Sequence, residues 1–204
     1  LHLDNYVQNS GMNGRYAWLQ DSEALCRSAV ELVSLALDAL NMDMPRVYLL
    51  PDRDSQILGR AMAQTLGVPA VAGPGDGAGL IVAYDLNDLD IETWRSVSEH
   101  RPGQLLWGHA SQWTSRHPCA ADIVTYLYQS NEKPWNERVV FDRFSHEPTN
   151  VPADQSPPQE IAVRIASLEP NNEAHDIEAL QTLIKGASAA RNKFSALRDH
   201  GRRT

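Results

Sequence analysis

The alternation of short apolar segments with amphipathic segments of helical period, from residue 21 to residue 141, constrains the fold of this chain more than any other feature. It predicts strands at 47–50, 69–72, 80–84, 104–109 and 138–141, and helices at 21–40, 54–66, 91–99 and 119–130. Strands that alternate with helices favour right-handed crossovers between parallel neighbours. We therefore predict an α/β fold: a doubly wound three-layer domain with a mostly parallel sheet of about five strands and a C-terminal helical extension.

Local signals at the element ends sharpen these boundaries. Asp21 and Asp54 are the predicted N-caps of the first two helices, and Gly67 is the predicted stop of the second. The predicted helix at 119–130 rests on apolar residues that recur at intervals of three and four positions. These residues are Ile123, Val124, Leu127 and Tyr128.

Residues 145–158 are rich in Pro, Asn, Asp and Ser, which predicts a linker between an α/β domain at 1–144 and a helical extension at 159–204. The order Ser156-Pro157-Pro158-Gln159 is typical of a capping box at a helix start. An apolar stripe from Ile177 to Phe194 must be covered, and we expect it to pack on the domain rather than on a partner helix. Because the chain starts at Leu1, we expect a segment of a longer protein, with other domains or a partner protein beside it.

Composition limits the classes of partner. No apolar run approaches the roughly 18 residues that a membrane-spanning helix needs, so no membrane association is expected. The net charge is −8 although the last residues are basic, and so acidic a body repels phosphate backbones, which argues against nucleic acid as a partner. Cys26 and Cys119 belong to no C-x-x-C pair, which favours a cytoplasmic protein without a disulfide framework.

Polar residues follow three of the predicted strands. Ligands of open α/β sheets bind outside the carboxyl ends of the strands, so polar groups there are candidates for binding. Each of them can also simply turn the chain or cap a helix. The predicted ligand-binding residues, which should share one edge of the sheet, are Asp52, Asp54, Ser55, Asp85, Asp88 and His109.

Two further motifs lack the sequence context that their functions require. The glycine-rich segment 73–79 leads into a strand and has no Lys-Ser or Lys-Thr ending, so it is not a P-loop. His109-Ala110-Ser111 followed by Pro118-Cys119 has the order of a zinc deaminase phrase, but Ser111 stands where the proton-shuttling Glu belongs. A metal site from His109, His117 and Cys119 remains an alternative, although no metal site is predicted and the cofactor is unknown.

The stretch from Arg46 to Ser111 resembles the type I phosphoribosyltransferase fold in the order of its elements. A helix ends in a phrase like that family's at residues 63–69, and a buried strand at 80–84 runs into an acidic loop. In that family the acidic loop has two adjacent acids followed by Thr and Gly residues that hold the ribose 5-phosphate. Here Leu86 follows Asp85 and the Thr-Thr-Gly run is missing. The resemblance thus implies the fold, and a degenerate, non-catalytic relative rather than the activity.

Two functions follow as hypotheses. The first is a binding or regulatory α/β domain, with a phosphorylated small molecule as the ligand that the resemblance implies. The second is a metal-dependent enzyme that acts on a phosphorylated or nucleotide-like small molecule. The enzyme would need a divalent cation to bridge the carboxylates of the sheet edge to phosphate.

Overall fold

Six parallel strands form the central sheet, in the order β1-β6-β5-β4-β2-β3. In this computed structural model the described residues are 15–99, 101–115, 120–141 and 147–169, with Thr182 and Gly186. Every neighbouring pair of strands in the sheet is parallel. The strands are β1 (Arg15–Gln20), β2 (Val47–Leu49), β3 (Ala70–Ala72), β4 (Gly79–Asp85), β5 (Gln104–Gln112) and β6 (Ile123–Glu132). The predicted α/β class and mostly parallel sheet are confirmed.

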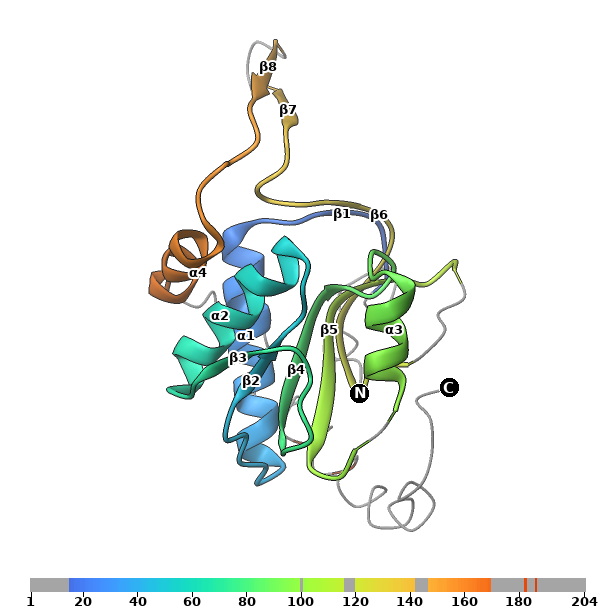
Figure 1. Cartoon of the computed structure of the whole chain (residues 1–204). Helices are drawn as coiled ribbons and strands as arrows, with labels where there is room; N and C mark the ends of the chain where they lie inside the picture. Colours follow the sequence, from blue (N-terminus) through green and yellow to red (C-terminus); the bar gives the residue numbers. More distant parts are fainter. Residues whose placement is uncertain are drawn as a thin grey trace.

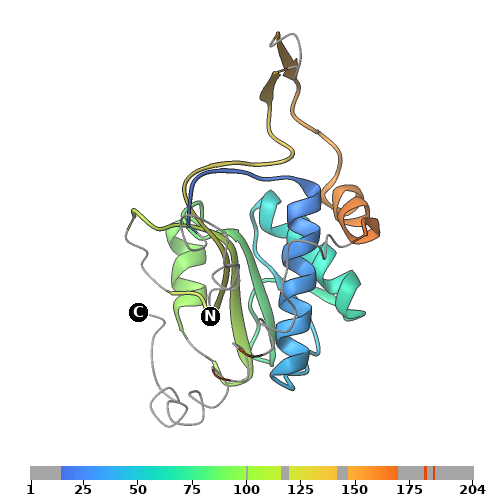
Figure 2. The same ribbon diagram turned by 180° about the vertical axis from the view of Figure 1, so that it is seen from behind.

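Helices cover both faces of the sheet, as expected for three layers. The helices are α1 (Glu23–Ala39), α2 (Arg53–Leu66), α3 (Ile91–Ser98) and α4 (Pro158–Ser167). Helices α1 and α2 lie on one face, with α4 beside α2, and α3 lies on the other face (Figure 1, Figure 2). None of the helices formed by the described residues is long and apolar enough to cross a membrane.

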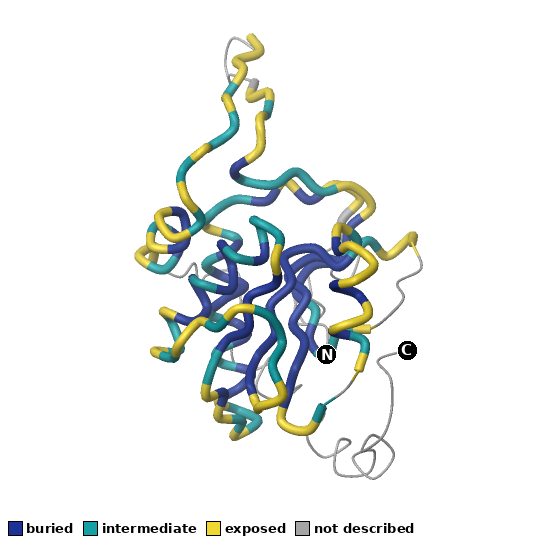
Figure 3. Tube along the Cα trace, viewed as in Figure 1, coloured by how far each residue is buried: buried dark blue, intermediate teal, exposed yellow. Residues whose placement is uncertain are grey.

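The core follows from this arrangement. The larger apolar cluster joins α1, α2 and α4 to the sheet, and a smaller one joins α3 to the opposite face. The central strands are buried along their length, which explains their nearly continuous apolar sequences (Figure 3). Polar groups at the strand ends are thereby held on a rigid frame.

The segment predicted as a helix at 119–130 is instead strand β6, which corrects the sequence analysis. Residues 123–126 are Ile, Val, Thr and Tyr, which favour strands because their side chains fit a pleated, half-buried surface. β6 lies between β1 and β5. Pairing with these two strands therefore favours a strand here, although the apolar residues recur at helical spacing. β6 and β1, which was not predicted either, add two strands to the sheet, and the predicted strand at 138–141 lies outside it, so the sheet has six strands instead of about five.

Strand β7 (Arg138–Phe141) was predicted as part of the sheet and is not. It pairs antiparallel with β8 (Pro148–Val151) in a separate two-stranded hairpin. β8 lies inside the stretch predicted as a linker at 145–158, so part of that stretch is ordered strand.

Two predicted helix caps shift by one or two residues. Ser22 rather than Asp21 caps α1, and Asp52 rather than Asp54 caps α2. Gly67 ends α2 in the left-handed conformation with φ of 67°, as predicted. Helix α4 starts after Pro157 without a side-chain cap, so the predicted capping box does not form.

Helix α4 packs on α2 through buried Ile161, Ala162 and Ile165. The apolar stripe from Ile177 to Phe194 lies outside the described residues. The division into a domain at 1–144, a linker and an extension at 159–204 therefore stays a prediction.

Candidate functional site

The predicted site residues lie around the carboxyl ends of β2, β4 and β5. Asp52 follows β2, and Asp54 and Ser55 are in the first turn of α2. Asp85 is the last residue of β4 and Asp88 lies in the turn after it. His109 lies within β5. Their side chains separate into distinct networks instead of converging on one point.

The first network is centred on Lys133, which directly follows β6. Its ammonium group forms ion pairs with the carboxylates of Asp54 and Asp88, at 2.6 Å in the case of Asp88. The indole Nε1 of Trp135 donates a second hydrogen bond to Asp54, at 2.6 Å. Burial lowers the pKa of Lys133, but the hydrogen bonds to Asp54 and Asp88 outweigh it and raise the pKa above its ordinary value. Lys133 therefore carries the charge that balances these acids.

The second network holds Asp85, which is buried. Its carboxylate accepts hydrogen bonds from the Tyr128 hydroxyl at 2.5 Å, the Asn87 backbone at 3.0 Å and the Asn131 amide at 3.4 Å. Burial raises the pKa of Asp85, and the hydrogen bonds from Tyr128 and Asn87 offset part of that effect. Both carboxylate oxygens are thus occupied by protein donors.

The third network surrounds Asp21, a residue that the sequence analysis treated only as a helix cap. Its Oδ2 atom lies 2.5 Å from the Tyr84 hydroxyl, 2.8 Å from His109 Nε2 and 3.5 Å from Cys26 Sγ. All four side chains are buried. Burial, with the nearby Asp21 charge, raises the pKa of both Cys26 and Tyr84, so both stay protonated at neutral pH. No local sequence signal marks this cluster, because Asp21 and His109 are 88 positions apart.

Asp52 and Ser55 have structural partners. The Asp52 carboxylate accepts the Ser55 backbone N–H at 2.7 Å, which caps α2. The Ser55 hydroxyl accepts the Tyr84 backbone N–H at 3.0 Å and so ties α2 to β4. Only Asp54 and Asp88, among the six predicted residues, are brought onto a common partner.

Asp21, Cys26 and His109 offer ligand atoms within 4.8 Å of one another, close enough to be tested as a metal set. The donor types N, O and S suit zinc. However, the thiolate is the metal ligand, and burial opposes its formation by raising the pKa of Cys26. Asp21 Oδ2 is also shared by hydrogen bonds with three groups. The cluster therefore fits a closed hydrogen-bond network better than a metal site.

The set His109, His117 and Cys119 cannot be assembled from the described residues, because His117 and Cys119 lie outside them. His109 itself is engaged with Asp21.

A pocket of about 390 Å³ opens at the same carboxyl edge, beyond β2 and β3. Its volume is in the range of small-molecule sites. Apolar strand ends meet polar groups of α2 and α3 in its walls. The lining residues are Leu49, Leu50, Pro51, Gln56, Arg60, Ala72, Gly73, Glu92, Thr93 and Ser96. None of the six predicted residues is among them, although Asp52 directly follows Pro51.

Arg60 supplies the basic group of this pocket. Its Nη1 donates to Gln159 at 3.2 Å, while its Nε is buried and has no hydrogen-bond partner among the described residues. Buried guanidinium N–H groups are normally paired, and carboxylate or phosphate oxygens are their strongest acceptors. That Nε is enclosed by protein, so an anionic ligand in the pocket would meet the terminal nitrogens of the guanidinium group, which also borders a smaller pocket of about 270 Å³ together with Gln159.

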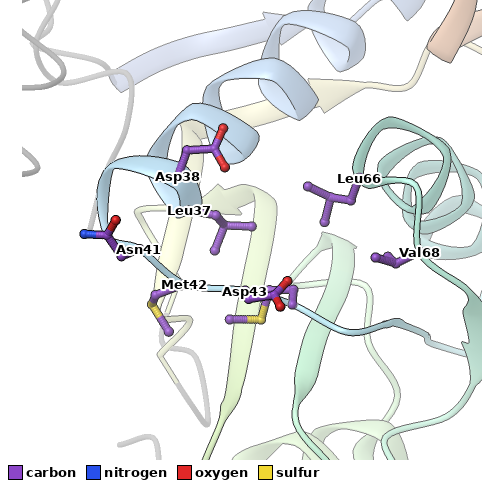
Figure 4. Close-up of a pocket in the computed structure, with 8 residues that line it drawn as sticks. Leu37, Asp38, Asn41, Met42, Asp43, Leu66 and Val68 are labelled. Atoms are coloured by element: carbon purple, nitrogen blue, oxygen red, sulfur yellow. The ribbon is translucent and has the colours of Figure 1, made fainter.

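A second pocket, of about 360 Å³, lies at the opposite edge of the sheet, between the ends of α1 and α2 (Figure 4). Leu37, Leu66 and Val68 form its apolar wall, and Asp38 and Asp43 are its acids. Because ligands of α/β sheets bind at the carboxyl edge, we assign it no function.

No family model matches the chain, and no curated protein matches it. Among solved structures, it is similar to a purine phosphoribosyltransferase from Pyrococcus horikoshii Ot3, with 12% identity and a TM-score of 0.46. The match covers 62% of this chain and 99% of that chain. A likeness of this size is a distant resemblance in fold.

Proposed function

We propose that this chain is a non-catalytic binding domain that takes a small anionic molecule in the carboxyl-edge pocket beside Arg60. One observation carries the proposal. The acids that could take part in catalysis are engaged by partners within the protein, whereas Arg60 places a cationic group on the wall of the neighbouring pocket.

Catalysis at this edge would need a carboxylate free to bind a cation or to move a proton. Asp54 and Asp88 share the ammonium group of Lys133, and Asp85 accepts from Tyr128. His109 is buried against Asp21. Each of these side chains already has a partner within the protein, although the Asp88 side chain is 53% exposed to solvent.

Binding of a ligand requires no free carboxylate, but only a pocket whose groups complement the ligand. The pocket offers apolar surface from Leu49 and Leu50, hydroxyl groups from Thr93 and Ser96, and the guanidinium group of Arg60. A few polar groups on an apolar wall are typical of small-molecule sites. A phosphate or carboxylate group on the ligand would pair with Arg60. A phosphorylated small molecule, as the family resemblance implies, is the ligand class that we favour.

A thermal-shift experiment with ribose 5-phosphate, adenosine monophosphate and inorganic phosphate tests this function. A ligand at 100 times its Kd adds about 2.7 kcal/mol to the free energy of unfolding, so Tm should rise by roughly 5–10 °C. We expect the rise to be lost in Arg60→Gln and kept in Arg95→Gln, a matched change of an exposed Arg on α3 outside the pocket. No shift with any of the three probes would contradict the proposal.

The metal-dependent enzyme remains the second candidate, because Asp54 and Asp88 already share one cationic partner. A divalent ion in place of the Lys133 ammonium group would give the bridge that this enzyme needs. Each ligand is therefore measured with and without Mg²⁺. A shift that appears only with Mg²⁺ would favour the enzyme over the binding domain.

A further inference from the structure

Two opposite charges border the carboxyl-edge pocket. Among the ten described residues that line it, Arg60 and Glu92 alone are charged. Arg60 belongs to α2, and Glu92 lies in the first turn of α3. These two helices lie on opposite faces of the sheet, so the two charges belong to opposite walls of the pocket (Figure 1, Figure 2). The pocket therefore has a basic side and an acidic side.

These two charges are not neutralised by other charges of the described chain. The ion pairs that its residues form include neither Arg60 nor Glu92. Arg60 donates to Gln159, which is uncharged, at 3.2 Å. Glu92 is exposed to solvent, and its carboxylate accepts no hydrogen bond from a described residue. Each charge is thus open to a ligand group of opposite sign.

The start of α3 does not offer a second place for an anion. The Asp90 carboxylate accepts the Thr93 backbone N–H at 2.7 Å, and the Asp90 carbonyl accepts the Trp94 N–H at 2.9 Å. These N–H groups, which could otherwise bind an anion, are therefore satisfied within the protein. The carboxylates of Asp90 and Glu92 also repel negative charge. The anionic group of a ligand is thus directed to Arg60 on the opposite wall.

The acidic wall favours a different ligand group. A carboxylate accepts hydrogen bonds and donates none, so its complement is a donor, and a charged donor such as an ammonium group binds it most strongly. Between the two charges the pocket has the apolar side chains of Leu49 and Leu50, which offer no competing charge. A ligand with only negative charge would be repelled by Glu92, whereas a ligand with an added ammonium group would be attracted.

We infer that the ligand of this pocket is a phosphorylated amine, with its phosphate group at Arg60 and its ammonium group at Glu92. The inference rests on the proposed function, because it names the chemical class of ligand for the same pocket. It also separates the pocket from a general phosphate site, since the acidic wall selects among phosphorylated molecules.

Two matched pairs of probes test this ligand class with the full chain at pH 7. Glucosamine 6-phosphate is compared with glucose 6-phosphate, and phosphoethanolamine with ethyl phosphate, so that the first member of each pair adds an ammonium group. Isothermal titration calorimetry measures each Kd. We expect the ammonium-bearing member to bind about fivefold more tightly in at least one pair, as for an ion pair partly screened by water. Equal Kd values within both pairs would overturn the inference.

Glu92→Gln separates contact with the ligand from a structural role. The variant keeps the size of the side chain and removes its charge, so the ammonium-bearing probe should bind about fivefold more weakly. Its partner without the ammonium group should bind at least as tightly as before, because repulsion of the phosphate is lost. Damage to the fold would instead weaken both probes.

Glu99→Gln is the matched control for Glu92→Gln. Glu99 is an exposed acid at the other end of α3 and lies outside the pocket. This control should leave the Kd of every probe unchanged. A Glu92→Gln variant that keeps the wild-type preference for the ammonium group would overturn the inference.

Arg60→Gln distinguishes failure of this inference from failure of the proposed function. It should abolish binding of all the probes, because the phosphate group loses its partner. If no probe binds even the wild type, the proposed function fails and the inference fails with it. If the members of each pair bind the wild type equally and Arg60→Gln removes both, the inference alone fails. Binding that survives Arg60→Gln with its ammonium preference would overturn both.

Discussion

The two halves of the carboxyl edge differ in how their polar groups are used. Over β4, β5 and β6, charged side chains are engaged by other groups of the protein, as in the networks of Lys133, Asp85 and Asp21. Over β2 and β3, a pocket is lined by mostly uncharged residues together with Arg60 and Glu92. The half that is richest in catalytic residue types is thus the half with the least capacity left to bind a ligand.

The difference teaches that residue type alone does not mark a site. The contact between Asp54 and Lys133 links the start of α2 to the end of β6 across 79 positions of sequence. Such long-range polar contacts fix the ends of crossovers, which is a structural role. A site also needs open volume beside groups that can contact a ligand, and the pocket half offers that volume.

The largest expected effect is that of Asp21→Ala in the paired half. It leaves the Tyr84 hydroxyl and His109 buried without their acceptor. Loss of one partner from a buried charged network costs about 3–5 kcal/mol of the free energy of unfolding. Urea denaturation measures it, with Asp21→Asn as the control that keeps one acceptor oxygen. A loss below about 1 kcal/mol would mean that this network does not hold the fold.

Lys133→Met should have the next largest effect. Asp54 and Asp88 would lose their common cation and repel each other. The loss should be about 1–3 kcal/mol, less than for a fully buried pair, because the Lys133 side chain is partly exposed to solvent. Lys133→Arg keeps the charge and is the control. If both variants unfold at the wild-type urea midpoint, the ion pairs contribute nothing to stability.

Asp85 provides a test through pH. Because the folded-state pKa of Asp85 is raised above its ordinary value of 3.8, the folded chain binds a proton at higher pH than the unfolded chain does. The contribution of this proton to the stability of the fold is fully present below pH 3.8 and is lost as the pH rises through the raised pKa of the folded state. The wild type should therefore gain stability relative to Asp85→Asn as pH falls from 7.5 toward 4. A difference in unfolding free energy that is constant with pH would contradict the burial of a charged Asp85.

Arg60→Gln, in the pocket half, should have the smallest effect on stability. Its side chain makes one long hydrogen bond, to Gln159. We expect the free energy of unfolding to stay within about 0.5 kcal/mol of the wild type while ligand binding is lost. A stability loss as large as that of Lys133→Met would remove the contrast between the two halves.

Much of the fold could be predicted from the sequence. The run from β2 to β5 was found because its strands are short, apolar and separated by helices with recognisable ends such as Gly67. The strand at 123–132 was missed because its apolar residues also occur at helical spacing, and only pairing with β1 and β5 resolves the ambiguity. β1 carries no strong local pattern.

The site was harder to predict than the fold. Strand ends located the carboxyl edge, but nothing in the sequence indicates that Lys133 reaches Asp54 and Asp88. Nor does it show that Asp21 meets His109, or that Trp135, in polar sequence surroundings, is buried. These contacts depend on how crossovers bring distant segments together. The binding role of the six predicted residues and the cytoplasmic location stay predictions.

The most direct test of the contrast is a map of ligand contact by ¹H–¹⁵N NMR of the labelled chain, with ribose 5-phosphate added in the presence of Mg²⁺. The account predicts shift changes at pocket residues such as Gln56, Gly73 and Ser96, and unchanged signals at Asp85, Asp88 and Lys133. Changes confined to Asp85, Asp88 and Lys133, with the pocket residues silent, would contradict it.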